Sequence, residues 1–541
     1  MSTPRHASGG RQPDHVYWRR RTVLAALAAL PVAGGIWGIE RLLSDDGSAP
    51  KQGTGSAPSR PHGRVTVSDG AKPPVPKRMI IAEESFKPGT DAWDVPQDEA
   101  VWAKVRGFAS RTSVERGESF DLFVSTAAPS FTATAYRMGA YPQGKAGREV
   151  WRSAPMPGVR QPGPRVDPVT NMRDAPWAKS LTVTAGEDWV PGQYLIKLES
   201  TDGGQSQVPV VIRDDAYAAP VHIQQDVTTW QAYNLWGGAS LYQGEGGRSR
   251  VVSFDRPYLG SGQGNFLGGV YEIGALVESL GLEVTYSTNL DSHLRPDLVG
   301  QHKVWISPAH DEYWSLEMRR GVEAARDAGT NLMFLGANCC YRRIRLEDSA
   351  LGPVRQVVNY RDASADPLTG KDDARVTTSW REPPAADPES SLIGTYYESN
   401  PVDASMVVVD AGAWMFEGTG IRDGDSWPHV VGNEYDRVTP EVPTPPTIQV
   451  LAHSPLVIKG RNSFSDMTYY TAGSGAAVFS SGSIWFERQI QPGGTGYTAQ
   501  MIAMTTTLLK AFAAGPAGRV HPSQPNLDRL GITPGYISGI S

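Results

Sequence analysis

Two short apolar runs of this chain each end in a cluster of polar and aromatic residues. The first run, 305–314, ends in His310 to Trp314, and the second, 332–341, ends in Asn338 to Tyr341. Between them, apolar residues recur at three- and four-residue spacing over 315–329, which predicts a helix. Because a strand, a helix and a strand make two parallel strands, both clusters are expected at one sheet edge. Open α/β folds bind their ligands at this edge.

The same alternation of strands and helices extends over the carboxyl-terminal part of the chain. Runs at 221–224 and 283–287 are predicted strands, and 271–280 has helical spacing. Alternating strands and helices predict an α/β fold with a doubly wound, mostly parallel sheet. We assign this domain to residues 216–541.

Residues 79–215 have a different pattern. Short apolar or alternating runs are separated by turn residues, as at 116–118 and 201–204, and no stretch has clear helical spacing. Several short strands in succession predict an immunoglobulin-like β-sandwich. Because it contains no cluster of titratable residues with catalytic spacing, we expect a structural role, or binding of a partner or glycan.

The amino terminus resembles an export signal. Three arginines at 19–21 precede an uncharged apolar run over 23–39, which is the pattern of a twin-arginine signal. We therefore predict that residues 1–42 are a cleaved signal or a retained membrane anchor, so that the protein is either secreted or membrane-attached. Residues 43–78, rich in Ser, Gly, Pro and Lys, predict a disordered linker.

The charge and the cysteines exclude several classes of function. A net charge of −6 gives no broad basic surface, so nucleic acid is not an expected partner. The only two cysteines, Cys339 and Cys340, are adjacent, so they form no ordinary disulfide and lack the spacing of a zinc site. They are either small buried side chains behind the predicted site or a vicinal redox pair.

Four motifs, taken in order, resemble those of one family. They lie at 226–230, 310–315, 336–345 and 432–436, and they resemble the family named for the large (β) subunit of N,N-dimethylformamidase. The resemblance covers about residues 220–513. It implies a glutamine-amidotransferase-like α/β fold, a mononuclear Fe³⁺ held by two tyrosinates and one glutamate, and hydrolysis of an amide C–N bond.

Carried onto the matching positions, the resemblance implies that Tyr313, Tyr341 and Glu434 hold the iron. Glu312 or Asp436 could take the place of Glu434. Phenolate and carboxylate oxygens are hard ligands that suit Fe³⁺, and a phenol loses its proton near pH 7 only beside such a cation. Three protein ligands would leave positions for water and a substrate carbonyl.

The other polar residues of the two clusters are the predicted catalytic groups, namely His310, Asp311, Glu312 and Asn338. The first three would orient the metal ligands or carry a proton to the leaving amine. Neither strand is followed by a Gly-x-Ser-x-Gly motif or its cysteine counterpart, so nucleophilic catalysis is not expected.

Three classes of function are compatible with these residues. The first, which we favour, is a metal-dependent amidohydrolase that acts on a small or surface-displayed amide, with or without a small partner subunit. The second is a non-catalytic module that binds glycan or peptide at the cell surface. The third is a hydrolase of another linkage that uses His310, Asp311 and Glu312 without a metal. Fold likeness alone does not choose between them.

Overall fold

The computed structural model describes residues 79–535 of the chain. The predicted signal or anchor at 1–42 and the predicted linker at 43–78 lie outside the described residues. Within residues 79–535, no helix is both long and apolar enough to cross a membrane.

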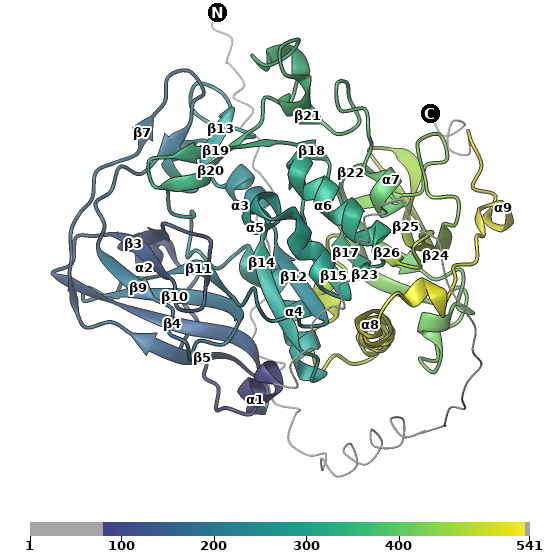
Figure 1. Ribbon diagram of the computed structural model, residues 1–541, viewed down its shortest axis with the longest axis horizontal. Coiled ribbons are helices and arrows are strands. Elements are labelled where there is room, and N and C mark those ends of the chain that lie inside the picture. The colour runs from purple at the N-terminus through teal and green to yellow at the C-terminus, as the bar shows by residue number, and fades with distance from the viewer. Residues whose placement is uncertain (1–78, 536–541) are drawn as a thin grey trace, which may run out of the picture. The chain divides into compact units, whose positions relative to one another are not determined.

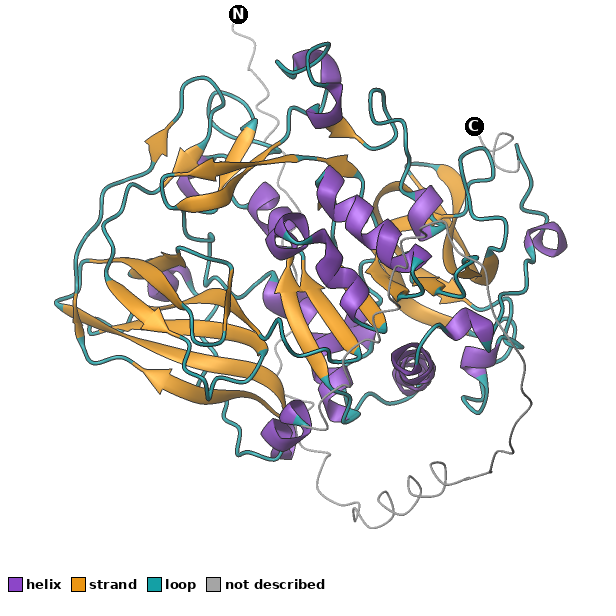
Figure 2. Cartoon of the chain, in the orientation of Figure 1, coloured by secondary structure: helices purple, strands orange, loops and turns teal. Residues whose placement is uncertain are grey.

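The amino-terminal part of the described chain consists of two β-sheets (Figures 1 and 2). One has the strand order β1-β3-β9, and the other has the order β2-β11-β10-β4-β5, with β6 beside β4. Their bounds are β1 Val105–Ala109, β2 Ser113–Glu115, β3 Ser119–Thr126, β4 Ser130–Tyr141, β5 Lys145–Arg152, β6 Met156–Pro157, β9 Leu181–Thr184, β10 Gly192–Ser200 and β11 Gln205–Arg213. Apolar side chains from both sheets, such as Leu122 and Ile196, share one buried core. The immunoglobulin-like assignment stays a prediction.

Two short helices in this part were not predicted from the sequence. They are α1 (Ile80–Ser85) and α2 (Glu99–Trp102), with six and four residues. Helices of fewer than two turns show no apolar periodicity, so spacing could not reveal them. Asp98 caps α2 by accepting a hydrogen bond from the Ala100 amide, as short polar side chains commonly do.

The carboxyl-terminal part is built around a seven-stranded sheet with the order β14-β12-β15-β17-β26-β25-β24. The bounds are β12 Val221–Gln225, β14 Val284–Thr288, β15 Val304–Ala309, β17 Asn331–Gly336, β24 Gln449–Ile458, β25 Arg461–Thr471 and β26 Ala477–Ser480. The first five strands in this order are parallel, β25 runs antiparallel to its neighbour β26, and β24 at the edge runs antiparallel to β25. Helix α6 (Leu316–Asp327) joins β15 to its parallel neighbour β17, which confirms the predicted strand-helix-strand unit. The glutamine-amidotransferase-like assignment stays a prediction.

The described chain contains six further α-helices and four smaller sheets. The helices are α3 Val227–Tyr233, α4 Val270–Ser279, α5 Asn289–Leu294, α7 Ser390–Ile393, α8 Tyr497–Ala514 and α9 Leu527–Leu530. The smaller sheets contain β7 Arg165–Val166 with β8 Arg173–Asp174; β13 Val251–Ser253, β20 Gly352–Val358 and β19 Arg345–Ser349; β16 Tyr313–Trp314, β18 Arg342–Arg343 and β21 Thr378–Ser379; and β22 Tyr396–Val407 with β23 Ser426–Arg437.

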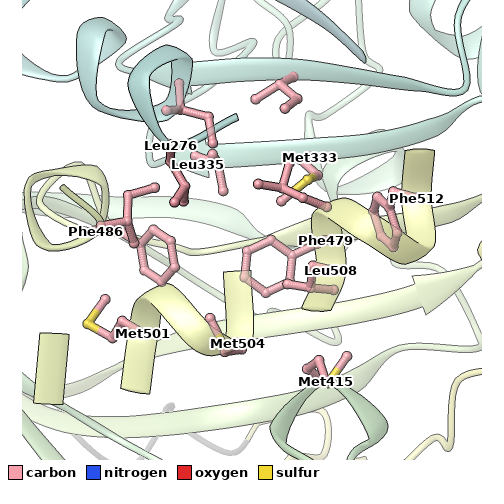
Figure 3. Close-up of a cluster of buried hydrophobic side chains, with 14 of the residues drawn as sticks. Leu276, Met333, Leu335, Met415, Phe479, Phe486, Met501, Met504, Leu508 and Phe512 are labelled. Atoms are coloured by element: carbon pink, nitrogen blue, oxygen red, sulfur yellow. The ribbon is translucent and has the colours of Figure 1, made fainter. Parts of the chain in front are cut away.

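Alternate residues of the central strands face opposite layers, as the two-residue period of a strand requires. In β17, Leu332 and Phe334 share a buried cluster with Met318 of α6. Met333, between them, faces the other layer with Leu508 of α8 (Figure 3). The central sheet is therefore covered on both faces at β17, and this strand is apolar from Leu332 to Leu335.

Both parts of the described chain lie within a single compact unit. Strand β11 ends at Arg213 and β12 begins at Val221, so a connection of seven residues joins the first part to the central sheet. Helix α4 packs against β4, so the central sheet and the amino-terminal sheets share an interface.

Candidate active site

The loops that carry the predicted site residues follow neighbouring parallel strands. His310 follows β15, and Asn338 comes two residues after β17. A Cβ atom at Gly336 would lie 1.4 Å from the carbonyl oxygen of Ala309, so only glycine fits where the two strands end. At this close approach Asn338 Nδ2 and His310 Nε2 are 3.2 Å apart.

Two tyrosine hydroxyls converge on one carboxylate at this edge. Tyr233 ends α3, Tyr242 lies in the following loop, and Glu312 follows β15. The two hydroxyl oxygens are 2.7 Å apart, and Oε2 of Glu312 lies 2.8 Å from the first and 2.7 Å from the second. These three atoms, which we call the oxygen triangle, have nearly equal sides. Glu312 is buried, whereas Tyr233 is 39% exposed.

A second carboxylate, Glu434 of β23, lies on the other side of His310. Its oxygens accept hydrogen bonds from Asn338 Nδ2 at 2.8 Å and from Asn400 Nδ2 at 3.0 Å. His310 Nε2 lies 3.5 Å from Oε2 of Glu312 and 3.6 Å from Oε2 of Glu434. Burial raises the pKa of Glu434, and the neighbouring His310 opposes this shift. The same imidazole nitrogen thus lies near both carboxylates.

Asp311 points away from these groups. Its carboxylate accepts hydrogen bonds from Ser307 at 2.9 Å and from Asn289 and Gln224 at 3.0 Å. The side chain is fully buried, and burial raises its pKa to about 6 although these hydrogen bonds oppose the shift. The structure therefore places this predicted catalytic residue beneath the loop, where it ties β15 to its neighbours.

Tyr313 and Tyr341, which the sequence predicted as metal ligands, occupy different surroundings. Tyr313 is fully buried behind the oxygen triangle, with its hydroxyl 2.8 Å from that of Tyr242. The ring of Tyr341 lies against the guanidinium groups of Arg342 and Arg381, 4.6 and 4.8 Å from its centroid. Within the described residues the Tyr341 hydroxyl forms no hydrogen bond, and its ring centroid lies 5.5 Å from that of Tyr397.

The remaining predicted residues lie under the second strand end. Asp436, the other possible carboxylate ligand, accepts a hydrogen bond from the Asn338 amide at 2.8 Å, and burial raises its pKa to about 7. Cys339 and Cys340 are free and buried, and both belong to the apolar cluster that includes Met318. Burial raises the pKa of both thiols, which agrees with their interpretation as small buried side chains.

Sequence reasoning missed both tyrosines of the oxygen triangle and also Asn400. In the described part of the chain, no three His, Cys, Asp or Glu side chains gather in an arrangement that could hold a metal. A metal at this edge would therefore need phenol oxygens, and those beside Glu312 come from Tyr233 and Tyr242. The one available signal was that Tyr233 comes shortly after the predicted strand at 221–224.

Three further carboxylates are buried next to this edge, on Asp226, Glu272 and Glu487. A Cβ atom at Gly269 would lie 3.0 Å from Oε2 of Glu487 and 2.6 Å from Cβ of Ala309, which places Glu487 beside the end of β15. Neither oxygen of Glu487 has a hydrogen-bonding partner among the described residues. Burial first, and then the charges of Glu272 and Asp226, raise its pKa well above the ordinary value.

Glu487→Gln is expected to stabilise the protein, by an amount that grows with pH. Because the pKa is raised in the folded state, the folded protein holds a proton that the unfolded chain releases. Stability is therefore full below the unfolded-state pKa and is lost as the pH rises towards the folded-state pKa, by about 1.4 kcal/mol per pH unit. Glutamine has no such proton. Urea midpoints of both proteins between about pH 4.5 and 7.5 would measure this slope.

The exposed Glu382 provides the control for this titration. Glu382→Gln should leave the urea midpoint nearly constant relative to wild type across the same pH range. A pH-independent difference between Glu487→Gln and wild type would show that Glu487 is charged in the folded protein at all these pH values.

Comparison with known proteins identifies one family. Residues 132–499 match the family model described as N,N-dimethylformamidase beta subunit-like, C-terminal. This range covers the whole of the site described above, together with the strands β4, β10 and β11 of the amino-terminal part. No curated protein matches the chain.

The likeness to solved structures is weak. An uncharacterized protein from Bacillus anthracis str. Ames is 9% identical over 22% of this chain and 94% of its own, with a TM-score of 0.14. A cycloisomaltooligosaccharide glucanotransferase of Paenibacillus sp., complexed with cycloisomaltoheptaose, is 8% identical over 50% of this chain and 35% of its own, with a TM-score of 0.15. At such scores neither structure informs the fold or the function.

Proposed function

The chain belongs to the N,N-dimethylformamidase beta subunit-like, C-terminal family, and we propose that it is a metal-dependent hydrolase that cleaves an amide C–N bond. The observation that carries this proposal is the oxygen triangle of Tyr233, Tyr242 and Glu312. Its sides of 2.7, 2.7 and 2.8 Å join two phenols and one carboxylate. Fold likeness alone would not support a reaction, whereas two phenols and a carboxylate in contact are a set of oxygen ligands that suits a hard metal ion.

The donor set fits a hard trivalent ion such as Fe³⁺. All three donors are oxygens, and phenolate and carboxylate oxygens are hard ligands. Neighbouring oxygens in an octahedral shell with metal–oxygen bonds of about 2.0–2.1 Å lie about 2.8–3.0 Å apart, which is close to the sides of the triangle. Tyr233, Tyr242 and Glu312 would therefore hold the ion on one face and contribute three negative charges. When bound, the ion would polarise the carbonyl of the amide.

The protein's own groups supply the proton transfers. Glu434 is held by Asn338 and Asn400, so its carboxylate keeps one orientation towards His310. We propose that Oε2 of Glu434 accepts a proton from the attacking water and that His310 Nε2, 3.6 Å away, passes it to the nitrogen of the leaving amine. Asn338 is placed to orient both groups, since its Nδ2 atom lies near each of them.

This proposal changes the metal ligands predicted from the sequence. Tyr233 and Tyr242 replace Tyr313 and Tyr341, because their hydroxyls are the ones beside a carboxylate. Glu312, the alternative carboxylate in the sequence prediction, replaces Glu434, which becomes the acid-base group. The proposal gives Asp311 no role in proton transfer, because buried side chains hold its carboxylate on the far side of the loop.

The remaining parts of the proposal rest on the sequence. The twin-arginine-like pattern at 19–24 lies outside the described residues, and it supports an exported protein that is either secreted or attached to the membrane. We therefore propose a small or surface-displayed amide as the substrate class.

Metal content and the visible spectrum test the proposed function. The purified full-length protein is expected to contain about one iron per chain, because three anionic oxygens from three segments converge there. It should also show a phenolate-to-iron absorption band. Tyr233→Phe and Tyr242→Phe should each weaken or remove both the band and the bound iron.

Tyr341→Phe is the matched control, because this tyrosine belongs to the ligand set predicted from the sequence but not to the triangle. It should keep the band and the metal. Loss of the band in Tyr341→Phe but not in Tyr233→Phe would instead favour Tyr313, Tyr341 and Glu434, the metal ligands predicted from the sequence. A folded, colourless and metal-free protein would contradict the proposal. In that case, loss of hydrolysis in His310→Ala would favour the metal-independent hydrolase. The observation that supports this second candidate is that His310 Nε2 lies near the carboxylates of Glu312 and Glu434.

A further inference from the structure

Arginine side chains gather on one side of the oxygen triangle. Nε of Arg342, in β18, lies 3.6 Å from Oε1 of Glu312. The guanidinium carbon of Arg361, which follows β20, lies 4.0 Å from the centroid of the Tyr242 ring. Both guanidinium groups therefore lie beside corners of the triangle.

Two more arginines extend this positive region. Burial first, and then the positive charges of Arg361, Arg250 and Arg342, lower the pKa of Arg248, so the four cations lie close enough to repel one another. The nitrogens of Arg248 donate to the carbonyl oxygens of Asn359 and Tyr360. These neutral acceptors leave the positive charge uncompensated.

The arginines have little opposite charge of their own. Among the described residues, Glu312 is the carboxylate that forms an ion pair with Arg342, and neither Arg248 nor Arg361 forms an ion pair. If Glu312 holds a metal, as proposed above, its charge is shared with that metal. The guanidinium groups of Arg342 and Arg361 are then left without an anion.

Several guanidinium nitrogens also lack hydrogen-bond acceptors. Nε and Nη2 of Arg361 and Nε of Arg342 are buried and have no hydrogen-bonding partner in residues 79–535. The polar groups that act on Arg361 are the hydroxyls of Tyr313 and Tyr242 and, behind them, the carboxylate of Glu312. Buried donors are normally paired, and arginine presents a fork of N–H groups that suits a carboxylate. The missing acceptor would therefore be an anion.

The backbone of Arg361 supports a specific placement of its side chain. Its φ of 66° lies in the left-handed region, which arginine rarely adopts. Such conformations persist where the surrounding structure fixes them, often at binding sites. The stacking of this guanidinium on the Tyr242 ring fits that pattern.

We propose that Arg342 and Arg361 form an anion-binding subsite beside the oxygen triangle, and that the protein selects amides that carry a carboxylate, such as N-acylated amino acids. This inference rests on the proposed function in placing the scissile amide at the triangle. The carboxylate takes the free donors of Arg342 and Arg361, and Arg248 contributes charge from behind. The substrate class then differs from that of a site for small neutral amides.

Calorimetric titration of the purified full-length protein with N-acetylglycine and with N-acetylglycinamide tests the subsite without relying on catalysis. The two probes differ only in replacing the carboxylate by a neutral amide. The wild-type protein is expected to bind the acid about tenfold or more tightly than the amide, because paired guanidinium–carboxylate bonds are charge-assisted. Equal affinity for the two probes would overturn the inference, and this comparison needs no variant.

Variants assign the preference to the two arginines. Arg361→Met and Arg342→Met should each reduce the acid-to-amide affinity ratio about fivefold or more, and Arg361→Lys should restore only part of it because lysine keeps the charge but not the fork. Arg375→Met, at an exposed arginine nearby in the chain, should leave the ratio unchanged. A wild-type ratio in both Arg342→Met and Arg361→Met would overturn the assignment.

The outcomes separate this inference from the proposed function. Preferential binding of N-acetylglycine by a metal-free protein that hydrolyses no amide would keep the anion subsite and reject the hydrolase. Iron-dependent hydrolysis of N,N-dimethylformamide with no preference for the acid probe would keep the hydrolase and reject the subsite.

Discussion

Replacement of Glu312 by glutamine is expected to lower kcat/KM for amide hydrolysis by about 10³-fold or more, because a metal polarising a carbonyl contributes several kcal/mol. Glu312 is the corner that both phenols of the triangle share. Glutamine keeps the volume but removes the negative charge and presents an NH₂ donor to two hydroxyls. Glycine release from N-acetylglycine and dimethylamine release from N,N-dimethylformamide would measure the rate, with bound iron determined in the same preparation.

The control for this variant is Glu347→Gln. Glu347 lies on β19, its side chain is 42% exposed, and it pairs with Arg345. Because Arg345 keeps a second carboxylate partner, Asp366 at 3.2 Å, this variant should keep its fold, its iron and its activity. If Glu312→Gln folded normally and kept most of the wild-type kcat/KM, the oxygen triangle would not be the active site.

The loop that follows β15 explains which of the predicted residues reach the site. His310 and Glu312 face the second carboxylate and the phenols. Asp311 is held on the other side by Asn289 and Gln224. Tyr313 begins β16, and its hydroxyl lies 2.8 Å from that of Tyr242. Because Ala309 has a φ of 50°, the two-residue period of the strand does not continue into this loop, so the sequence alone could not separate these residues.

The two tyrosines of the triangle could not be predicted by adjacency. Tyr242 and Tyr233 precede Glu312 by 70 and 79 residues and come from the region that follows β12. They reach Glu312 because β12 lies next to β15 in the sheet. The strand-helix-strand pattern predicts that β15 and β17 are neighbours in the sheet. Local patterns do not say which earlier strand pairs with β15 on its other side.

Glu434 shows a different limit of sequence reasoning. The family motif pointed to this residue, and the structure does bring it within 2.8 Å of Asn338, 96 positions away in the chain. Its role, however, depends on which groups surround it. Glu434 is held by two amide side chains and lies near His310, whereas the phenols surround Glu312. The motif pointed to this residue, and its proposed role as an acid-base group rests on the groups that surround it.

Loss of the buried ion pair between Arg137 and Glu278 is expected to destabilise the protein by about 3–5 kcal/mol. Arg137 belongs to β4 and Glu278 to α4, and both side chains are fully buried. The contact has two hydrogen bonds, of 2.6 and 3.2 Å. The Tyr286 hydroxyl and the Ala140 amide also donate to this carboxylate. The pair therefore ties the amino-terminal sheets to the central sheet.

The two single variants should differ in severity. Glu278→Met leaves a buried guanidinium that cannot lose its proton, so it is expected to cost more than Arg137→Met, after which Glu278 can become protonated. The cost of Arg137→Met should grow with pH, because protonation of the unpaired Glu278 carboxyl becomes more costly at higher pH, whereas the cost of Glu278→Met should not change in this way. The gap between the variants should therefore close as the pH rises. Urea midpoints at about pH 5 and 8 would measure both effects.

The double variant decides whether the ion pair itself, rather than the packing of the two side chains, holds the parts together. If each single variant is costly because it leaves one charge unpaired, removing both charges should be less destabilising than the sum of the two single changes. The exposed pair of Arg111 and Glu118, with side chains 55% and 45% exposed, provides a matched cycle in which the coupling should stay below about 1 kcal/mol. Additive losses at Arg137 and Glu278 would contradict the ion-pair account and assign the stability of this interface to apolar contacts between β4 and α4.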